Sequence, residues 1–489
     1  MRAETFLYLN TSILNNPMNK TKIVATLGPS SSNKEVLREM FISGLNVCRV
    51  NFSHGAYEQH ADVIKTVRDL NKELGANVAI LADLQGPKIR TGEMENNGVF
   101  LEVGATCRIC TESVIGTAQQ FSINYLSLPK DVNPGERILL DDGKLILEVK
   151  QTDKKSNIDC VVIQGGILSS KKGVNFPNTK ISLPSLTEKD RMDLEFALEQ
   201  EVDWVGLSFV RNARDIIELK HLIANRNGKS KVIAKIEKPE ALECIDDIIK
   251  VTDGVMVARG DLGVEIPYQR VPIIQKMLIE KCISNAKPVI VATQMMESMI
   301  SNMTPTRAEV NDVANAVLDG ADAVMLSGET SVGKYPIEVI RTMSNIIEEV
   351  EKTPELYNKE ELPDPDNERF ITDSICFNAC RLSQRVKAKA IITMSFSGYT
   401  AYKVSSQRPD TAIFVFTSNR TILSQLNLLW GVKAFYYDKH ISTDHTIADI
   451  KYIMKSEGYL NAGDLVINIA SIPLEDLGGS NMLKLSYVD

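Results

Sequence analysis

Short runs of apolar residues recur along the chain and alternate with stretches whose apolar residues are spaced as on one face of a helix. Eight of these runs are predicted strands: 21–28, 46–53, 77–85, 203–210, 231–237, 254–261, 288–294 and 323–329. Apolar strands that alternate with helices are typical of an α/β fold with a parallel sheet, and eight of them are enough to close a (β/α)8 TIM barrel. Thr187 and Asp190 add the pattern of a capping box before one of the expected helices.

The helical pattern stops after the third predicted strand. From 88 to 183, Gly, Pro and alternating short strands predict an inserted β-rich domain, a lid in the form of a small β-barrel. The TIM barrel then comprises 18–87 and 184–351, a polar linker with several prolines covers 352–370, and 371–489 form a C-terminal open α/β domain. Residues 1–17 are expected to be a tail, either native or left over from cloning.

The composition excludes several classes of function. The 489 residues carry a net charge of -8, which argues against the basic surface of a nucleic-acid binder. No segment has the apolar length of a membrane helix and the first residues lack a basic leader, so we expect a cytoplasmic protein. The eight scattered cysteines suit that compartment, and the CxxC pair Cys107 and Cys110 is interpreted as two ordinary strand residues.

Polar residues close nearly every predicted barrel strand, at the end where barrel enzymes place their catalytic groups. These residues are Thr26, Arg49, Asn51, Ser53, Asp83, Ser208, Lys235, Glu237, Gly260, Asp261, Thr293, Ser327 and Glu329. One charged strand end is commonly structural, whereas a whole ring of them indicates an active site.

Two carboxylates in this ring suit a metal ion. Glu237 and Asp261 end neighbouring strands and could share a divalent cation, Mg2+ or Mn2+, which prefers oxygen ligands. Alternation along a strand puts Lys235 on the same face as Glu237, so an ammonium would lie beside the metal. The competing interpretation is a solvated salt bridge. A helix that begins at Asp261 would also direct free N–H groups towards an anion.

The chain resembles pyruvate kinase from about Thr21 to its end. The segments that carry the resemblance, in family order and spacing, are TKIVATLGPSS, RVNFSHG, DLQGPKIRTG, KKGVNFP, AKIE, ARGDLG, ATQMMESM, PTRAEVNDVANAV and LSGET. The predicted parts are similar to the A, B and C domains of that family. The resemblance implies Mg2+-dependent transfer of the phosphoryl group of phosphoenolpyruvate to ADP, which gives pyruvate and ATP in the last step of glycolysis.

The resemblance also implies roles for the ring of polar residues in phosphoryl transfer. Arg49 and Lys235 would neutralise the phosphoryl group, and Glu237 and Asp261 would hold the metal. Because this reaction leaves little covalent chemistry to the protein, positioning and charge stabilisation should supply most of the acceleration.

Further roles concern the carboxylate and the enolate of the substrate. Thr293, with the backbone of Gly260 and Asp261, would bind the substrate carboxylate and position the group that protonates the enolate. Ser327 and Glu329 would belong to the proton supply, although a Ser and a Glu at a strand end could equally cap the following helix.

The nucleotide would lie between the barrel and the lid. The contacts that the resemblance implies are Asn51, Phe52, Ser53, His54, Arg90 and Lys172. Because Arg90 and Lys172 stand at the two ends of the insertion, closing the lid would bring charge to the phosphates and exclude water.

Lys88 departs from the pattern of potassium-dependent members, which carry Glu at this position. A fixed ammonium could supply the charge of a monovalent cation and would repel one at close range, so we expect activity without K+. A surface lysine that swings away is the alternative. Any remaining monovalent site would use Asn51, Ser53, Asp83 and the carbonyl of Leu84.

The C-terminal domain offers a candidate effector site. Its loop SFSGYT, with Ser395, Ser397, Gly398 and Thr400, resembles the loop that binds an effector phosphate in the family, and a turn bonded to its own backbone is the competing interpretation. Glu475 and Asp476 would disfavour a second phosphate, so a sugar monophosphate, a nucleotide or no effector at all remain open. The resemblance alone suggests a homotetramer.

Two other functions compete with this interpretation. A metal-dependent barrel lyase or aldolase acting on a pyruvate enolate would also use metal carboxylates and a lysine, but it would not need a lid carrying Arg90 and Lys172. A catalytically silent effector-binding protein would have no reason to keep Arg49, Lys235 and Thr293 together. Turnover of phosphoenolpyruvate and ADP discriminates among the three.

Overall fold

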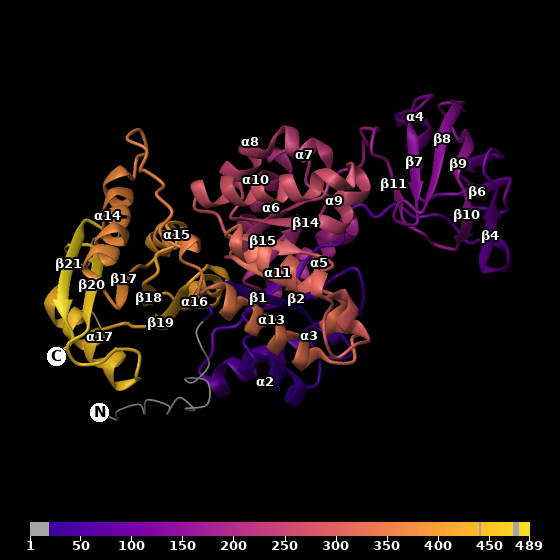
Figure 1. The fold of residues 1–489 in the computed structure, drawn as a ribbon. Helices are drawn as coiled ribbons and strands as arrows, with labels where there is room; N and C mark the ends of the chain where they lie inside the picture. Colours follow the sequence, from indigo (N-terminus) through magenta and orange to yellow (C-terminus); the bar gives the residue numbers. More distant parts are fainter. Residues whose placement is uncertain (1–18, 440–441, 473–478) are drawn as a thin grey trace.

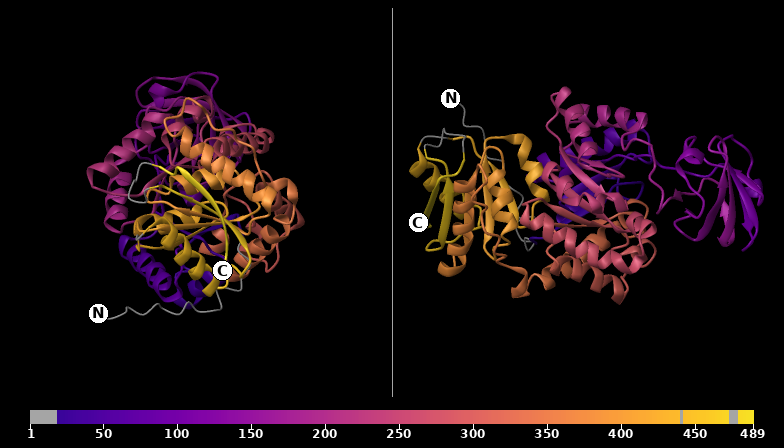
Figure 2. Two further views of the ribbon diagram at one scale, coloured as in Figure 1. Left: turned by 90° about the vertical axis from the view of Figure 1, so that its left-hand side faces the viewer. Right: turned by 90° about the horizontal axis from the view of Figure 1, so that it is seen from above.

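The computed structural model describes residues 19–439, 442–472 and 479–489. The predicted tail 1–17 and the acidic pair Glu475 and Asp476 lie outside the described residues. Figure 1 shows the described parts as a row, with the barrel between the lid and the C-terminal domain, and Figure 2 shows the same row from two further sides.

The central barrel is built from parallel strands. Within the described residues, eight strands close in the order β1-β16-β15-β14-β13-β12-β3-β2. They are β1 (Lys22–Thr26), β2 (Val47–Asn51), β3 (Ala79–Asp83), β12 (Trp204–Leu207), β13 (Lys231–Ile236), β14 (Gly254–Ala258), β15 (Val289–Ala292) and β16 (Ala323–Leu326). Each coincides with a predicted apolar run, so the predicted TIM barrel is confirmed.

Helices cover the outside of the barrel. They are α2 (Lys34–Ile42), α3 (Tyr57–Leu74), α5 (Glu188–Glu199), α6 (Ala213–Asn225), α7 (Pro239–Glu243), α8 (Ile245–Val251), α9 (Arg259–Glu265), α10 (Val271–Ser284), α11 (Arg307–Leu318), α12 (Gly328–Ser331) and α13 (Pro336–Val350). The capping box before α5 is present, because Thr187 Oγ1 accepts from the N–H of Asp190 and the Asp190 carboxylate accepts from the N–H of Thr187. None of the described helices is long and apolar enough to cross a membrane.

The lid is inserted between β3 and α5. It contains β4 (Gly98–Leu101), β5 (Thr106–Cys110), β6 (Gln120–Ser122), α4 (Leu128–Asp131), β7 (Arg137–Leu140), β8 (Leu145–Thr152), β9 (Asn157–Gln164), β10 (Gly166–Ser169) and β11 (Val174–Asn175). As far as the chain is described, these strands form a six-stranded sheet and a two-stranded sheet around one core. Bridges from Arg90 to Gly173 and from Thr91 to Ile123 link the two edges of the six-stranded sheet, so the strands surround the core as the expected small β-barrel would. Cys107 and Cys110 are buried in β5.

The C-terminal domain is an open α/β sheet. Its described strands pair in the order β19-β18-β17-β20-β21. They are β17 (Ala390–Met394), β18 (Ala412–Thr417), β19 (Val432–Tyr436), β20 (Leu465–Ala470) and β21 (Met482–Tyr487), with the helices α14 (Phe370–Val386), α15 (Tyr399–Ser406), α16 (Arg420–Gln425) and α17 (Thr443–Ser456). The antiparallel edge strand β21 was not predicted. Leu428 of this domain packs into the core inside the barrel.

Candidate active site

The polar strand-end residues gather at one rim of the barrel. The chain leaves β3 at Asp83, builds the lid and returns before α5, so the lid joins the barrel at the carboxyl ends of the strands. The strand register pairs Thr26 with Arg49 and Asn51 with Asp83 across neighbouring strands. Residues that are distant in the sequence therefore meet at the end where barrel enzymes carry their chemistry.

Lys235, at the end of β13, is the centre of this rim. Its Nζ lies 2.6 Å from Ser208 Oγ, 3.0 Å from Glu237 Oε1 and 3.1 Å from Asp83 Oδ1. Burial alone would lower the pKa of Lys235, but Asp83 and Glu237 raise it above its ordinary value. The Lys235 side chain is buried. These charges therefore form a buried network and not the solvated salt bridge that was the competing interpretation of the metal site.

Arg49 is fixed from two sides. Its Nε donates to Asp83 Oδ2 at 2.6 Å and its Nη1 donates to Thr26 Oγ1 at 2.8 Å. Although burial by itself would raise the pKa of Asp83, Lys235 and Arg49 lower it below the ordinary value. Asp83 thus holds two cations at the rim, where they can face an anion together.

Glu237 and Asp261 could hold a divalent cation. Glu237 accepts a hydrogen bond from the N–H of Phe209 at 2.8 Å, and burial raises the pKa of Glu237 to about 7 while Asp261 adds to the rise. Such a carboxylate gains from a nearby cation, which fits the predicted metal site. The described residues contain no group of three His, Cys, Asp or Glu side chains that could hold a metal, so water or substrate would have to supply the other ligands.

Thr293, just beyond β15, has an unusual backbone. Its φ is 70° and that of Gln294 is 54°, in the left-handed region that β-branched residues rarely adopt. The Thr293 hydroxyl donates to Ala292 O at 2.6 Å and accepts from the N–H of Gly260 at 2.8 Å. The helix α9 begins at Arg259, not at Asp261 as predicted, and the Gly260 N–H that we expected to be free for an anion is already bonded.

Ser327 and Glu329 lie beyond β16 and form one small network. The buried Glu329 carboxylate accepts from the N–H of Ser327 at 2.7 Å and from the N–H of Met296 at 3.2 Å. Ser327 is the N-cap residue of α12, but its side chain makes no capping hydrogen bond. Glu329 therefore ties the loops after β15 and β16 to each other, next to Thr293.

The predicted nucleotide contacts divide into residues of the barrel and residues of the lid. Phe52 is buried against His60 and Phe196, with ring centroids 4.8 and 6.0 Å away, so only its backbone can face a ligand. Arg90 donates to Lys171 O at 2.8 Å, and Lys172 Nζ pairs with Asp141 at 2.9 Å, so these cations belong to the base of the lid.

His54 connects the barrel with this base. Burial lowers the pKa of His54, and the nearby cations Lys88, Arg90 and Arg49 lower it further. Because these three cations act on one imidazole, they form a positive region between the lid and the rim, which suits a polyphosphate.

Three of the four residues of the predicted monovalent site, Asn51, Asp83 and Leu84, have oxygen atoms that already bind partners within the protein. Asn51 Oδ1 accepts from the N–H of Ser53 at 3.1 Å, and Leu84 O accepts from Ser208 Oγ at 2.7 Å. The Asp83 carboxylate pairs with two protein cations, as described above. The predicted monovalent site therefore has few oxygen atoms without a partner that a further cation could bind.

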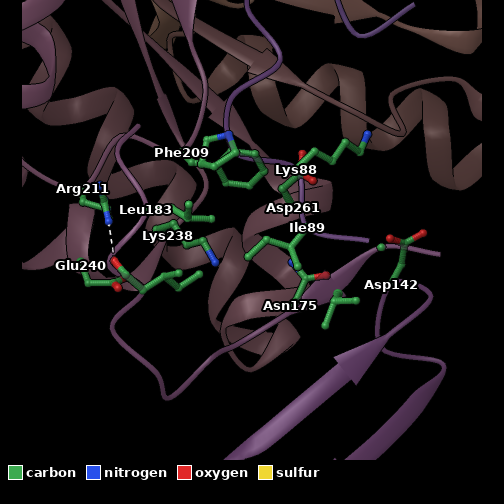
Figure 3. Close-up of a pocket in the computed structure, with 14 residues that line it drawn as sticks. Lys88, Ile89, Asp142, Asn175, Leu183, Phe209, Arg211, Lys238, Glu240 and Asp261 are labelled. Carbon is green, nitrogen blue, oxygen red and sulfur yellow. Dashed lines mark hydrogen bonds between the residues drawn. The ribbon is translucent and has the colours of Figure 1, made fainter. Parts of the chain in front are cut away.

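A cavity of about 110 Å3 lies between the base of the lid and the barrel, and Figure 3 shows the side chains that line it. Lys88 and Asp261 both line it. Burial lowers the pKa of Lys88, Arg90 adds to the effect, and Asp261 opposes it. Lys88 thus stands at the junction of lid and rim, within electrostatic reach of a predicted metal ligand.

A second junction of lid and barrel was not predicted. Asn175, at the end of β11, donates to Glu265 Oε1 at 2.8 Å, and Lys238 pairs with the same carboxylate oxygen. Glu265 ends α9, and its side chain is buried. None of these three residues ends a predicted strand, so the pattern of polar residues at the strand ends does not indicate them.

The candidate effector loop is closed on itself. Ser395 Oγ accepts from the N–H of Gly398 at 3.0 Å, and Ser397 Oγ accepts from the N–H of Tyr399 at 3.4 Å. The buried Thr400 hydroxyl lies 3.0 Å from Ser480 Oγ. The turn bonded to its own backbone, which the sequence left open, is therefore present.

Comparison with known proteins agrees with this geometry. The model of the pyruvate kinase barrel domain matches residues 18–340, and that of the pyruvate kinase alpha/beta domain matches 373–486. Pyruvate kinase of Geobacillus stearothermophilus is 43% identical over 96% of this chain and 80% of its own length, and that of Clostridium acetobutylicum is 42% identical over 96% and 100%. A solved pyruvate kinase from Cryptosporidium parvum superposes with a TM-score of 0.91 at 35% identity and covers 98% of both chains. The chain belongs to the pyruvate kinase family, whose phosphotransferase reaction converts phosphoenolpyruvate and ADP into pyruvate and ATP.

Proposed function

We propose that the rim around Lys235 is the catalytic centre and that Mg2+ is the divalent cation it uses. The observation that carries this proposal is the buried ammonium of Lys235, within 3.1 Å of Asp83, Ser208 and Glu237. A metal on Glu237 and Asp261 would compete with Lys235 for the Glu237 carboxylate. The ammonium would then be free to turn towards the phosphoryl group of the substrate.

In the transfer step, the bond between phosphorus and the enol oxygen breaks and a bond to the terminal phosphate oxygen of ADP forms. The transferring group carries negative charge on its peripheral oxygens, so fixed cations lower the barrier. Lys235 and Arg49 supply these cations, and Asp83 orients both. Glu237 and Asp261 would hold the metal, which would supply further positive charge to stabilise the transferring phosphoryl group.

In the protonation step, the methylene carbon of the enolate gains a proton and the enol oxygen becomes the carbonyl of pyruvate. Thr293 is proposed to hold the water that delivers this proton and, with the backbone of Gly260 and Asp261, to bind the substrate carboxylate, for which the Gly260 N–H would have to leave the Thr293 hydroxyl. Glu329 is proposed to fix the loops that carry Thr293 and Ser327.

The lid is proposed to bring the nucleotide to the rim. Arg90 and Lys172 at its base, with Asn51, Ser53 and His54 on the barrel, would contact the phosphates. Closure would exclude water and strengthen each charge interaction inside the site.

Lys88 is proposed to stand in for a potassium ion. The engaged oxygen atoms of Asn51, Asp83 and Leu84 support this, because a cation would have to share them with their present partners. The electrostatic contact between Lys88 and Asp261 supports it too, because the ammonium adds positive charge where substrate and metal would meet.

Assembly and regulation complete the proposal. We expect a cytoplasmic homotetramer, which light scattering of the purified chain would measure. The loop with Ser395 and Ser397 would have to exchange its internal hydrogen bonds for a phosphate, so an effector, if it acts, is expected to be a sugar monophosphate or a nucleotide bound weakly.

The test is pyruvate formation from phosphoenolpyruvate and ADP with Mg2+, in buffer free of sodium and potassium, repeated with K+ added. Comparable turnover in both supports the catalytic proposal and the role of Lys88. Turnover that requires K+ would keep the enzyme and reject the role of Lys88. No turnover in either buffer would favour the lyase or the silent effector-binding protein.

A further inference from the structure

Arg259, the first residue of α9, ties together several elements beneath the proposed active site. Its Nη1 and Nη2 each donate to one carboxylate oxygen of Asp312, both at 2.7 Å. On its other side, Nη2 donates to Thr293 O at 2.7 Å and Nε donates to Ala292 O at 3.2 Å. The guanidinium thus joins α9, the end of β15 and α11 in one planar arrangement, and the fork with Asp312 fixes its orientation.

The carbonyls that Arg259 binds belong to the strained turn after β15. Thr293 and Gln294 both have positive φ, a conformation that is strained for residues other than glycine. A strained backbone persists only where its surroundings determine it. The two donors from Arg259 hold the carbonyls of Ala292 and Thr293, which lie on either side of the Thr293 α-carbon, and so help to keep this conformation in place.

The same turn sets the direction of the Thr293 hydroxyl. This hydroxyl donates to Ala292 O at 2.6 Å and accepts from the N–H of Gly260, the residue next to Arg259, at 2.8 Å. Ala292 O therefore receives one bond from Arg259 and one from Thr293. Moving the guanidinium would release the carbonyl against which the hydroxyl is oriented.

We propose that Arg259 is a positioning residue for the protonation of the enolate. It holds Thr293 in the strained conformation in which its hydroxyl can position the water that protonates the methylene carbon, and it does not touch the substrate. This inference rests on the proposed role of Thr293. Lys235 and Arg49, which serve phosphoryl transfer, are not partners of Arg259, so its loss should slow proton delivery more than phosphoryl transfer.

A purely structural role makes a different prediction. If Arg259 only joins α9 to α11 through Asp312, its loss would lower the thermal stability and leave the balance between the two chemical steps unchanged. The two steps must therefore be measured separately.

The test uses Arg259→Met and Arg259→Lys in the full chain, with Arg341→Met as the matched control. Arg341 lies on α13, where its half-exposed guanidinium pairs with Glu338. Proton transfer is followed as the exchange of pyruvate methyl hydrogens for deuterium, by NMR in D2O with Mg2+ and ATP. Phosphoryl transfer is followed as ATP formed in the first turnover after rapid mixing with phosphoenolpyruvate and ADP.

Arg259→Met is expected to slow methyl exchange roughly 100-fold, as a displacement of about 1 Å can, and to slow first-turnover ATP formation less than 10-fold. Arg259→Lys, which keeps the charge but loses the planar fork, should lie between Met and wild type. Combining Arg259→Met with Thr293→Ala should add little to the loss from Thr293→Ala alone, because both act through one hydroxyl.

Three results would overturn the inference: equal slowing of both steps, multiplicative losses in the double variant, or a methyl-exchange rate in Arg259→Met that matches the Arg341→Met control. The wild type separates this outcome from a failure of the proposed function. If the wild type forms neither ATP nor deuterated pyruvate, the proposed function itself is wrong. If it forms both, only the role of Arg259 is in question.

Discussion

The ammonium of Lys235 lies between the carboxylates of Glu237 and Asp83, 3.0 Å from the first and 3.1 Å from the second. Both carboxylates raise the pKa of Lys235, and this outweighs the burial that would lower it. Lys235 therefore stays protonated across the neutral range. The protein keeps a permanent positive charge where the phosphoryl group is expected to move, and one of its partners is a predicted metal ligand.

Replacing Lys235 by Met should lower kcat by about 100-fold to 1,000-fold, which is the usual effect of removing one group that stabilises transition-state charge. The variant should also be less stable by roughly 3–5 kcal/mol, because it leaves the buried Glu237 without its paired cation and Asp83 with Arg49 alone. Steady-state kinetics and thermal unfolding measure the two effects. Lys352→Met, on an exposed lysine that pairs with Glu349, is the control. A kcat within about threefold of wild type would reject Lys235 as the central cation.

The barrel could be predicted because each of its strands contains a run of apolar residues. In β1 and β3 every residue is buried on both faces of the sheet, which gives a continuous signal that a half-exposed strand lacks. The ring of polar residues could be predicted for a related reason. In a closed parallel barrel the topology alone brings the strand ends to one rim, so Arg49, Lys235 and Glu237 could be grouped without side-chain geometry.

Other features depend on contacts that no local pattern encodes. Arg259 reaches Asp312 across 53 positions, and Asn175 reaches Glu265 across 90. The side chain of Phe52 turns into the barrel wall although the motif places it among nucleotide contacts. The short strands of the lid fix their pairing only in three dimensions, where single bridges made by Arg90 and Thr91 link the edges of the six-stranded sheet.

Replacing Lys88 by Glu should make activity depend on K+. The substitution removes an ammonium that acts on Asp261, and it adds a carboxylate, a ligand that a monovalent cation prefers. We expect kcat without K+ to fall at least 10-fold and to recover severalfold when K+ is added, measured as pyruvate formation.

Lys88→Gln separates charge from ligation, because it removes the ammonium without adding a carboxylate. It should lose activity and respond less to K+ than the Glu variant. If neither variant responds to K+, or if both keep the activity of the wild type, Lys88 does not replace a cation.

The hydrogen bond between Asn175 and Glu265 should control how the lid sits on the barrel. It joins β11 of the lid to the end of α9 at 2.8 Å, and Lys238 neutralises the same carboxylate. Asn175→Ala should raise KM for ADP about 3-fold to 10-fold and change KM for phosphoenolpyruvate less, because the lid is expected to bring the nucleotide contacts.

Small-angle X-ray scattering of the same variant should detect a changed average lid position. Asn378→Ala, which removes an amide bonded within α14 of the C-terminal domain, is the control. Equal changes in both KM values, or scattering identical to wild type with no change in KM, would argue that the hydrogen bond between Asn175 and Glu265 does not control the position of the lid.

The buried lysine between the barrel and the C-terminal domain gives a pH prediction. Lys22, in β1, donates from Nζ to Val432 O of the C-terminal domain at 3.0 Å and is only 3% exposed. The pKa of Lys22 is lowered to about 8. Burial is the main cause and Lys433 contributes, while Glu351 and Asp322 oppose the change. Between about pH 8 and the unfolded value of 10.5, the unfolded chain binds a proton that the folded chain lacks. The contribution of this group to stability therefore rises with pH across that window, and its full penalty applies below it.

Lys22→Met removes the titration and keeps most of the apolar stem. The stability of the variant relative to wild type should therefore be highest near pH 7 and should decline by roughly 3 kcal/mol towards pH 10, as the wild-type lysine becomes neutral. Thermal unfolding at several pH values measures the difference. Lys34→Met, whose lysine is half exposed on α2, is the matched control. A relative stability of Lys22→Met that stays constant or increases between pH 7 and 10 would show that the ammonium is not penalised at this interface.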